Sequence, residues 1–314
     1  MDAFDDIYSR SSGLIENGVL LKKRVLIIGL GSFGSVIAVD LAKAAVGSFA
    51  LMDFDRLERH NIVRHASFLK DVGRLKTDAV EELILGKNPY ATVDKFAIDM
   101  NDDLELVGRE IDRADIVICA TDNNQSRFNL SRLLIDHPKV CLFGRAVTRA
   151  EGGDVFRYRP GGPCYCCLVG NQWFDQAAEE ITNEASARAS GRIAAYVSHE
   201  DADAMVQVGL ASDIEPITNM MVKLALVELA RGTNSGISAL ENELTFDYYM
   251  WANRRERRHK NWSPFPDGGN RPTILRWYGA NIEKATDCAL CGANGIALDE
   301  GADIEAQLAN LADG

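Results

Sequence analysis

The chain has 314 residues, with 34 Lys and Arg against 46 Asp and Glu, and a formal net charge of −12. A composition that is 46% hydrophobic and 25% charged is typical of globular proteins and excludes extensive disorder. The negative charge disfavours nucleic acid and anionic membrane surfaces as partners. No run is apolar for long enough to cross a bilayer, and the acidic start MDAFDDIYSR is unlike a secretory signal. We therefore expect a soluble, cytoplasmic protein.

Strands and helices alternate in the first half of the chain. Short apolar runs followed by turn residues predict strands over residues 24–28, 48–53, 91–97, 115–120 and 139–143. Apolar side chains three or four positions apart predict helices over residues 35–45, 74–86, 102–113 and 125–135. This alternation predicts an α/β fold, with a doubly wound, Rossmann-like and mostly parallel sheet that helices cover on both faces.

The second half has a different pattern. Residues 155–158 predict an antiparallel strand that extends the sheet, and residues 215–231 predict a strongly apolar helix. Between them, residues 169–213 are polar and weakly patterned, which predicts a long loop of the kind that is often functional. Aromatic, strand-like pieces lie between residues 240 and 280, around the basic run RRERRHK. Such a run either docks an acidic partner or is a solvated surface.

A glycine-rich turn, GLGSFG, lies between the first predicted strand and the first predicted helix. Gly29 permits the tight turn, Gly31 lets a phosphate approach the backbone, and Gly34 lets the helix pack closely. Asp53 ends the next strand, where an acidic side chain can meet ribose hydroxyls. Glycine-rich turns also occur in folds that bind no nucleotide. The strand, the helix and the downstream acid together favour a nucleotide site and leave the nucleotide open.

Several cations follow the second predicted strand. Asn61 and Arg64 share a face if their segment is helical, and Arg64 and Lys76 then supply two positive charges near the phosphates. Arg59 and Arg74 lie close by in the sequence and are rivals for this role. Taken alone, each of these cations is better explained as a solvated surface charge.

Asp122 directly follows the apolar strand IVICA. A carboxylate at the carboxyl end of a strand faces the crevice in which doubly wound sheets bind ligands, and there it can hold Mg²⁺ against phosphate oxygens. The alternative is that Asp122 is the N-cap of the following helix.

Seven cysteines form two groups. Two CxxC units with four thiols suit a tetrahedral structural Zn²⁺ site, with redox chemistry as the alternative. Cys166 is a spare thiol within the first unit, whereas Cys119 and Cys141 lie in predicted buried strands and are interpreted as core residues. The expected zinc ligands are Cys164, Cys167, Cys288 and Cys291.

The ordered motifs GLGSFG, DFD, NIVR, GRLK, KNP and ATDN, followed by paired CxxC units, resemble those of the ThiF/MoeB/HesA family. Members of that family are ubiquitin-activating-type (E1-like) adenylyltransferases. The N-terminal YSR also matches, so the resemblance covers residues 6–292. It departs from the family pattern at three positions, where Ser32, Phe33 and His65 replace the usual glycine, leucine and glutamine.

The resemblance implies a role for each matching residue. Gly29, Gly31 and Gly34 would cradle ATP; Asp53, followed by Asp55 in the same motif, would bind the ribose; Asn61, Arg64 and Lys76 would contact the phosphates; Asp122 would place Mg²⁺; and Arg10 would reach the ATP of the other subunit in a homodimer. The implied reaction is attack of a carboxylate on the α-phosphate. A carboxylate is already ionised at pH 7, so no strong base is needed.

Many relatives carry a nucleophilic cysteine in the crossover loop, and residues 169–213 contain none. Three alternatives follow: the enzyme stops at the adenylate, a partner's thiol attacks the adenylate, or a loop hydroxyl forms an oxyester. Ser198 is the leading hydroxyl, with His199 beside it as a general base. The other candidates are Ser186, Ser190 and Ser212.

The resemblance implies ATP-dependent activation of the C-terminal carboxylate of a ubiquitin-like or sulfur-carrier protein, with an E2-like acceptor as a further partner. The size of the chain is similar to that of enzymes from bacterial ubiquitin-like conjugation operons, some of them linked to antiviral defence. The alternatives are a peptide, small-molecule or tRNA carboxylate, an NAD-dependent oxidoreductase, and a binding module with a vestigial nucleotide site.

Four segments are expected along the chain. These are an ATP-binding adenylation core (1–160), the first zinc-knuckle half with the crossover loop and a core helix (161–232), an insertion with the second knuckle half (233–292) and an acidic tail (293–314).

Overall fold

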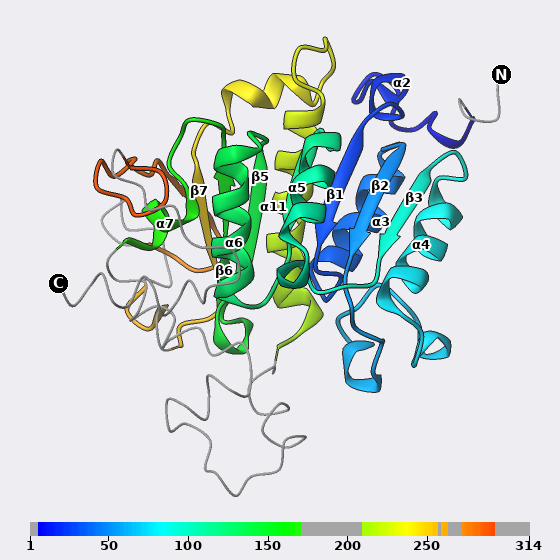
Figure 1. Ribbon diagram of the computed structural model, residues 1–314, viewed down its shortest axis with the longest axis horizontal. Coiled ribbons are helices and arrows are strands. Elements are labelled where there is room, and N and C mark those ends of the chain that lie inside the picture. The colour runs from blue at the N-terminus through cyan, green and yellow to red at the C-terminus, as the bar shows by residue number, and fades with distance from the viewer. Residues whose placement is uncertain (1–5, 171–208, 257–258, 263–271, 293–314) are drawn as a thin grey trace, which may run out of the picture.

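The computed structural model describes residues 6–170, 209–256, 259–262 and 272–292. Within these residues, eight strands form one sheet in the order β3-β2-β1-β4-β5-β6-β7-β8 (Figure 1). Strands β1 to β5 run parallel, and β6, β7 and β8 continue the sheet with antiparallel pairing. The strands are β1 (Arg24–Ile28), β2 (Ser48–Met52), β3 (Thr92–Phe96), β4 (Ile116–Cys119), β5 (Cys141–Ala146), β6 (Gly152–Tyr158), β7 (Tyr248–Ala252) and β8 (Trp277–Ala280). The predicted α/β class and the antiparallel extension are confirmed.

Helices cover both faces of the sheet because its central strands are apolar on both sides. In β1, Val25 and Ile27 join the core on one face, and Leu26 and Ile28 join the core on the other. The first face is covered by α3 (Gly34–Lys43), α4 (Lys76–Lys87) and α11 (Ala211–Leu229). The second is covered by α5 (Leu104–Arg113), α6 (Asn124–Asp136) and α7 (Tyr165–Val169), of which α5 and α6 are in front in Figure 1.

Short helical turns occupy the connections: α2 (Asn17–Leu20), η1 (Arg59–Asn61), η2 (Leu69–Asp71), η3 (Met100–Asp102), η4 (Thr148–Ala150) and η6 (Ser238–Asn242). None of the helices in the described parts of the chain is long and apolar enough to span a bilayer.

The predicted elements exist, and their boundaries shift where tertiary pairing decides them. Strand β5 continues to Ala146, beyond the predicted end at residue 143, because its final residues pair with β6 in a hairpin. Helix α11 starts at Ala211, so it includes residues that were expected to end the long loop. The loop itself lies outside the described residues from 171 to 208. The division into four segments stays a prediction.

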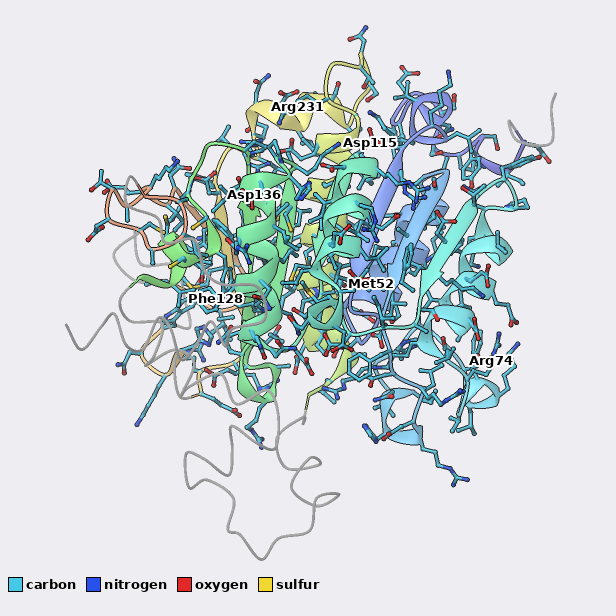
Figure 2. All side chains as sticks on the ribbon, viewed as in Figure 1. Met52, Arg74, Asp115, Phe128, Asp136 and Arg231 are labelled. Atoms are coloured by element: carbon cyan, nitrogen blue, oxygen red, sulfur yellow. The ribbon has the colours of Figure 1, made fainter. Side chains whose placement is uncertain are left out.

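All five parallel strands end at the same edge of the sheet. In Figure 2, Asp115, directly before β4, lies at the upper edge, and Met52, the last residue of β2, lies further down. The carboxyl ends therefore face downward in this view. The chain leaves β1 toward β2 on one side, while β4 pairs with β1 on the other side. Such a switch point opens a crevice outside the strand ends, where doubly wound sheets bind their ligands.

Candidate functional site

A cavity of about 460 Å³ lies at the carboxyl ends of the parallel strands. Its walls come from the segments that follow β1, β2, β3, β4 and β5, together with the start of α11. This volume suits a ligand of nucleotide size. Eight residues singled out from the sequence line it: Gly29, Gly31, Asp53, Asp55, Asn61, Arg64, Lys76 and Asp122.

The glycine turn adopts a conformation that side chains would prevent. Gly29 has φ +86°, and a Cβ there would lie 2.7 Å from the carbonyl oxygen of Ala120. A Cβ on Gly34 would lie 1.9 Å from the carbonyl oxygen of Gly29, so this glycine brings helix α3 against the turn. Gly31 is different, because nothing lies within 4 Å of a Cβ built there. Its backbone is open to a ligand in the cavity.

Asp53 and His65 hold the glycine turn from beneath. The Oδ2 atom of Asp53 accepts from the Leu30 N–H at 2.6 Å, and Oδ1 accepts from the Asp55 N–H at 2.8 Å. The Nδ1 atom of His65 accepts from the Ser67 N–H at 3.0 Å, so Nε2 carries the proton and donates to the Leu30 carbonyl at 2.7 Å. Burial lowers the pKa of His65 to about 4, which keeps the ring neutral.

The two acids of the DFD motif therefore have different roles in the structure. Asp53 is buried, and both of its oxygens are occupied by backbone N–H groups. Burial raises the pKa of Asp53, and the nearby Lys76 ammonium opposes that rise. Asp55 is about half exposed (48%) and forms an ion pair with Lys76 at 2.6 Å. Asp55 is thus the more exposed of the two carboxylates that line the cavity.

The structure distinguishes the predicted cations, Arg64 and Lys76, from the two rival arginines nearby in the sequence. Lys76 Nζ is held between Asp55 and Asp53, the latter at 3.8 Å, and Arg64 also lines the cavity. Arg74 instead pairs with Asp71 at 2.6 Å and with Glu82 at 2.7 Å. Neither Arg74 nor Arg59 lines the cavity.

Asn61 and Arg64 are placed by a short helical turn, as predicted. Asn61 ends η1, and its backbone carbonyl accepts from the N–H of Arg64 at 2.9 Å. The Oδ1 atom of Asn61 accepts from the Glu58 N–H at 2.9 Å, which orients the side chain. Both residues consequently face the cavity from one turn.

Asp122 is not a helix cap. The N-cap of α6 is Asn123, whose side chain accepts from the N–H of Ser126 at 2.8 Å. The capping alternative is therefore wrong. Asp122 remains exposed at the cavity wall, at the end of β4.

Three cavity-lining arginines were missed in the sequence. They are Arg56, Arg127 and Arg149. Arg127 is almost fully buried and donates to the carbonyl of Thr121 at 2.8 Å and to Oδ1 of Asn124 at 3.1 Å, which braces the segment that carries Asp122. Arg149 lies in η4, three positions beyond the end of β5, and the signal available in the sequence was its place shortly after a parallel strand.

Two predicted site residues, Arg10 and Ser198, are not among the residues that the structure places around the cavity. The position of Arg10 follows from its neighbour Tyr8. Tyr8 is buried and donates to the carbonyl of Ala42 at 3.2 Å, near the end of α3, whereas Arg10 is exposed. Helix α3 runs back from the carboxyl end of β1, so this anchor places Arg10 by the opposite edge of the sheet, and Arg10 does not line the cavity of its own chain. Ser198 lies outside the described residues.

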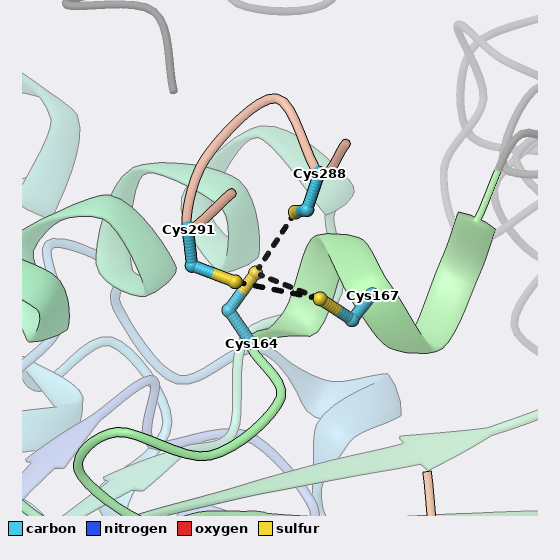
Figure 3. Close-up of side chains that lie close together, drawn as sticks. All are labelled: Cys164, Cys167, Cys288 and Cys291. Carbon is cyan, nitrogen blue, oxygen red and sulfur yellow. Dashed lines mark hydrogen bonds between the residues drawn. The ribbon is translucent and has the colours of Figure 1, made fainter. Parts of the chain in front are cut away.

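The two CxxC units meet in space. The four predicted sulfurs all lie within 4.8 Å of one another, with Sγ–Sγ distances of 3.8 Å (Cys164–Cys167), 3.5 Å (Cys164–Cys288) and 3.4 Å (Cys167–Cys291) (Figure 3). A Zn–S bond of 2.3 Å in a tetrahedron implies sulfurs about 3.8 Å apart. These four cysteines therefore form a tetracysteine cluster that fits Zn²⁺. Cys119 and Cys141 are buried in strands, as expected.

The tetracysteine cluster is linked to the wall of the cavity. Tyr165, next to Cys164, is fully buried, and its hydroxyl lies 3.2 Å from Oδ1 of Asn124 and 3.4 Å from Nη1 of Arg145. Asn124 in turn accepts from Arg127, which braces the Asp122 segment. Hydrogen bonds thus connect α7 to the cavity.

The doubly wound sheet, the glycine turn and the tetracysteine cluster define a Rossmann-like fold with a nucleotide-type cavity and a metal-type cysteine site. The ThiF family matches residues 11–260, most of the chain, and the protein belongs to this family.

Curated relatives match between about half and two thirds of the chain. It is 35% identical to the molybdopterin-synthase adenylyltransferase of Escherichia coli (strain K12) over 151 residues, which are 48% of this chain and 59% of that protein. It is 28% identical to the adenylyltransferase and sulfurtransferase MOCS3 of Culex quinquefasciatus over 212 residues, 66% of this chain and 47% of the relative. The chain thus spans about half the length of these relatives.

Solved structures extend the likeness over nearly all of the chain. The crystal structure of E. coli MccB matches with a TM-score of 0.64 and 16% identity, over 96% of this chain and 76% of that chain. The structure of MccB with ATP matches with a TM-score of 0.60 and 18% identity, over 88% and 68%. At these identities the likeness concerns the fold.

Proposed function

We propose that this protein is an ATP-dependent adenylyltransferase that activates a carboxylate of a sulfur-carrier protein, a ubiquitin-like protein or a peptide. One observation carries the proposal: a single cavity brings together the open backbone of Gly31, the cations Arg64 and Lys76, and the exposed carboxylate of Asp122. Hydride transfer by an NAD-dependent oxidoreductase does not require this combination of two cations and an exposed carboxylate. The relatives named as adenylyltransferases and the MccB structures with ATP, or with AMPCPP and MccA, support the same chemistry.

We propose an orientation for ATP in the cavity. The phosphates would lie over the glycine turn, near the backbone N–H groups at the start of α3. The ribose would lie toward the end of β2. We assign its hydroxyls to the two acids of the DFD motif, of which Asp55 is the more exposed. Each oxygen of Asp53 accepts one backbone N–H and can accept a further hydrogen bond. The Asp55–Lys76 ion pair would open as the ribose and phosphates take up the two partners.

The reaction needs positioning and charge stabilisation more than proton transfer. A carboxylate oxygen attacks the α-phosphorus, the bond from that phosphorus to the bridging oxygen breaks, and pyrophosphate leaves with the electron pair. Arg64 and Lys76 would stabilise the charge that develops on the phosphates. Asp122 would hold Mg²⁺, which would neutralise phosphate charge. Asn61 would fix a phosphate oxygen through its amide.

Finer features of the function complete the proposal. In a symmetric homodimer, Arg10 would reach the ATP of the partner subunit, which is consistent with its place away from the cavity of its own chain. The acyl group would pass to an E2-like acceptor, to another thiol or to a hydroxyl such as that of Ser198. The favoured substrate is a free C-terminal tail of a ubiquitin-like protein. Membership of a conjugation operon and a role in antiviral defence stay predictions.

The decisive experiment is ATP–pyrophosphate exchange. A ubiquitin-like protein encoded beside the gene is supplied intact or without its C-terminal residue, and a peptide with a free C-terminal carboxylate is tested in parallel. We expect exchange that requires a free carboxylate and that is lost in Asp122→Asn. If exchange is absent with every carboxylate while ATP stabilises the protein against heat, the proposed reaction is wrong. Stronger thermal stabilisation by NAD than by Mg·ATP would favour an oxidoreductase.

A further inference from the structure

The segment after β5 has a strained backbone at the wall of the cavity. Arg149 has φ 62° and Ala150 has φ 48°, so two consecutive residues with side chains adopt the left-handed conformation. That region is unfavourable for any residue with a Cβ, and it persists only where the surrounding structure fixes it. Strain of this kind often accompanies function.

The start of α11 and the end of β7 fix this conformation. The side-chain amide of Asn253 donates to the carbonyls of Ala150, at 2.9 Å, and of Asp213, at 2.8 Å. Arg254 donates to the carbonyl of Arg149 at 2.5 Å and forms an ion pair with Asp213. The first arginine of the basic run thus holds a strained turn rather than a partner protein.

The turn presents the Arg149 guanidinium at one end of the cavity. Gly144 within β5, Val147 just after it and Ile214 at the start of α11 line the cavity with Arg149, whereas the predicted nucleotide residues follow β1, β2 and β4. About half of the Arg149 side chain (47%) is exposed, and its Nε lies 3.6 Å from Oε2 of Glu256. That distance exceeds a charge-assisted hydrogen bond, so the ion pair leaves the guanidinium able to bind another anion.

We infer that Arg149 binds the carboxylate of the acyl substrate and orients it toward the α-phosphorus; this rests on the proposed function. An anionic carboxylate must approach a triphosphate that repels it, and a cation on the substrate side offsets this repulsion. One N–H of Arg149 holds the oxygen that becomes the carbonyl. The other oxygen forms the bond to the α-phosphorus as the bond to pyrophosphate breaks. The strained turn aims the guanidinium, and Asn253 and Arg254 are positioning residues for it.

The test measures how the protein distinguishes a carboxylate from its neutral amide. The probe is the ubiquitin-like protein encoded beside the gene, made with a free C-terminal carboxylate or as the C-terminal carboxamide. Calorimetry measures its Kd in the presence of AMPCPP, which permits binding without transfer. The variants are Arg149→Ala and Arg149→Lys. Arg109→Ala, which removes an exposed charge from α5, is the matched control.

We expect wild type and Arg109→Ala to bind the carboxylate roughly 10-fold or more tighter than the carboxamide. Arg149→Ala should reduce this ratio to below about 2-fold, and Arg149→Lys should give an intermediate ratio. The Kd of AMPCPP alone should stay within about 2-fold of wild type in every variant. A purely structural role for Arg149 would not selectively remove the preference for the charged probe.

Three results would overturn the inference. If Arg149→Ala keeps the wild-type ratio while wild type performs exchange, Arg149 does not bind the substrate and the proposed function stands. If Arg149→Ala weakens AMPCPP itself more than about 10-fold, Arg149 is a nucleotide ligand. If wild type neither performs exchange nor distinguishes the probes, both the proposed function and this inference are wrong.

Discussion

The parallel and antiparallel halves of the sheet hold the chain together in different ways. Strands β1 to β5 are packed between helices through apolar side chains, and their polar residues gather at the carboxyl edge around the cavity. The half that contains β6, β7 and β8 also packs through apolar side chains, such as Val155 and Phe156, and in addition it is tied to its surroundings by buried ion pairs and by the tetracysteine cluster.

Two buried arginines show how the antiparallel half is held. Arg145 donates to both oxygens of Asp154, at 2.8 and 2.7 Å, and Tyr248 of β7 donates to the same carboxylate at 3.0 Å. Arg157 is fully buried, pairs with Glu228 of α11 at 3.1 Å and also donates to backbone carbonyls before β7. Such pairs specify which segments meet and are costly to break. Apolar packing thus supports the strands that carry the cavity. Buried ion pairs fix how β6, β7 and α11 attach around those strands.

The largest effect should come from removing metal from the tetracysteine cluster. Metal in a structural Cys₄ site contributes directly to folding, so a strong chelator or Cys164→Ser should lower the free energy of unfolding by on the order of 5 kcal/mol. Urea unfolding followed by fluorescence, with zinc content from mass spectrometry, checks this. Cys141→Ala, which removes a buried thiol of β5, is the control and should keep the metal. An unchanged midpoint after complete metal removal would contradict the prediction.

A second test compares the stability lost with a buried ion pair of the antiparallel half and the stability lost with an exposed ion pair of the parallel half. Asp154→Asn keeps the shape of the side chain and leaves the Arg145 charge without its counter-charge, so we expect a loss of about 3–5 kcal/mol. Glu105→Gln changes an exposed pair with Arg109 and should cost less than about 1 kcal/mol. Equal losses in the two variants would show that the buried pair is not special.

A substitution at the edge of the cavity should change the activity of the protein and leave its stability unchanged. Asp122→Asn should slow ATP–pyrophosphate exchange about 100-fold or more, since it removes the charge assigned to Mg²⁺ while the exposed position tolerates the change. Its melting temperature should stay within about 2 °C of wild type. Asp136→Asn, at the other end of α6, is the control and should exchange normally. Full activity of Asp122→Asn would remove Asp122 from the reaction.

His65 predicts a pH dependence of stability beneath the glycine turn. Its pKa is about 4 in the folded protein and about 6.5 in an unfolded chain, so between these values only the unfolded state takes up the proton. The contribution of His65 is therefore complete above pH 6.5 and is lost as pH falls toward 4, by at most about 3 kcal/mol.

His65→Gln introduces the glutamine of the family pattern and keeps a donor for the Leu30 carbonyl. Other groups titrate alike in both proteins, so the difference between their urea midpoints at pH 7 and pH 5 isolates His65. We expect wild type to lose more stability than His65→Gln on acidification. Parallel losses in the two proteins would refute the assignment.

The smallest effect concerns the strained turn after β5. Ala150→Gly should relieve the left-handed backbone and raise the free energy of unfolding by about 1 kcal/mol or less, because glycine also gains freedom in the unfolded chain. Exchange should fall modestly if the strain aims Arg149. Gly86→Ala, in the last turn of α4, is a comparison that should also stabilise the protein but leave exchange unchanged. A faster Ala150→Gly enzyme would argue against a role for the strain.

Much of the cavity could be predicted because its residues follow strands. Gly29, Asp53 and Asp122 each come at or just after the carboxyl end of a parallel strand, and those ends meet at one edge whatever the details of packing. The tetracysteine cluster was predictable for a different reason, since the chemistry of four thiols requires them to meet. The exposed Arg10 and the occupied oxygens of Asp53 could not be derived, because both depend on packing and hydrogen bonds between distant segments.

By itself, the sequence determined the alternation of strands and helices, the glycine turn and the four cysteines, since each depends on local backbone geometry or on ligand chemistry. Only the tertiary structure decided which cations face the cavity, that Asn123 rather than Asp122 caps α6, and that Arg149 stands at the wall. The conformation of Arg149 depends on Asn253, which bonds to Ala150 from 103 positions away. No local pattern in a sequence encodes such a contact, because it forms only when β7 pairs with β6.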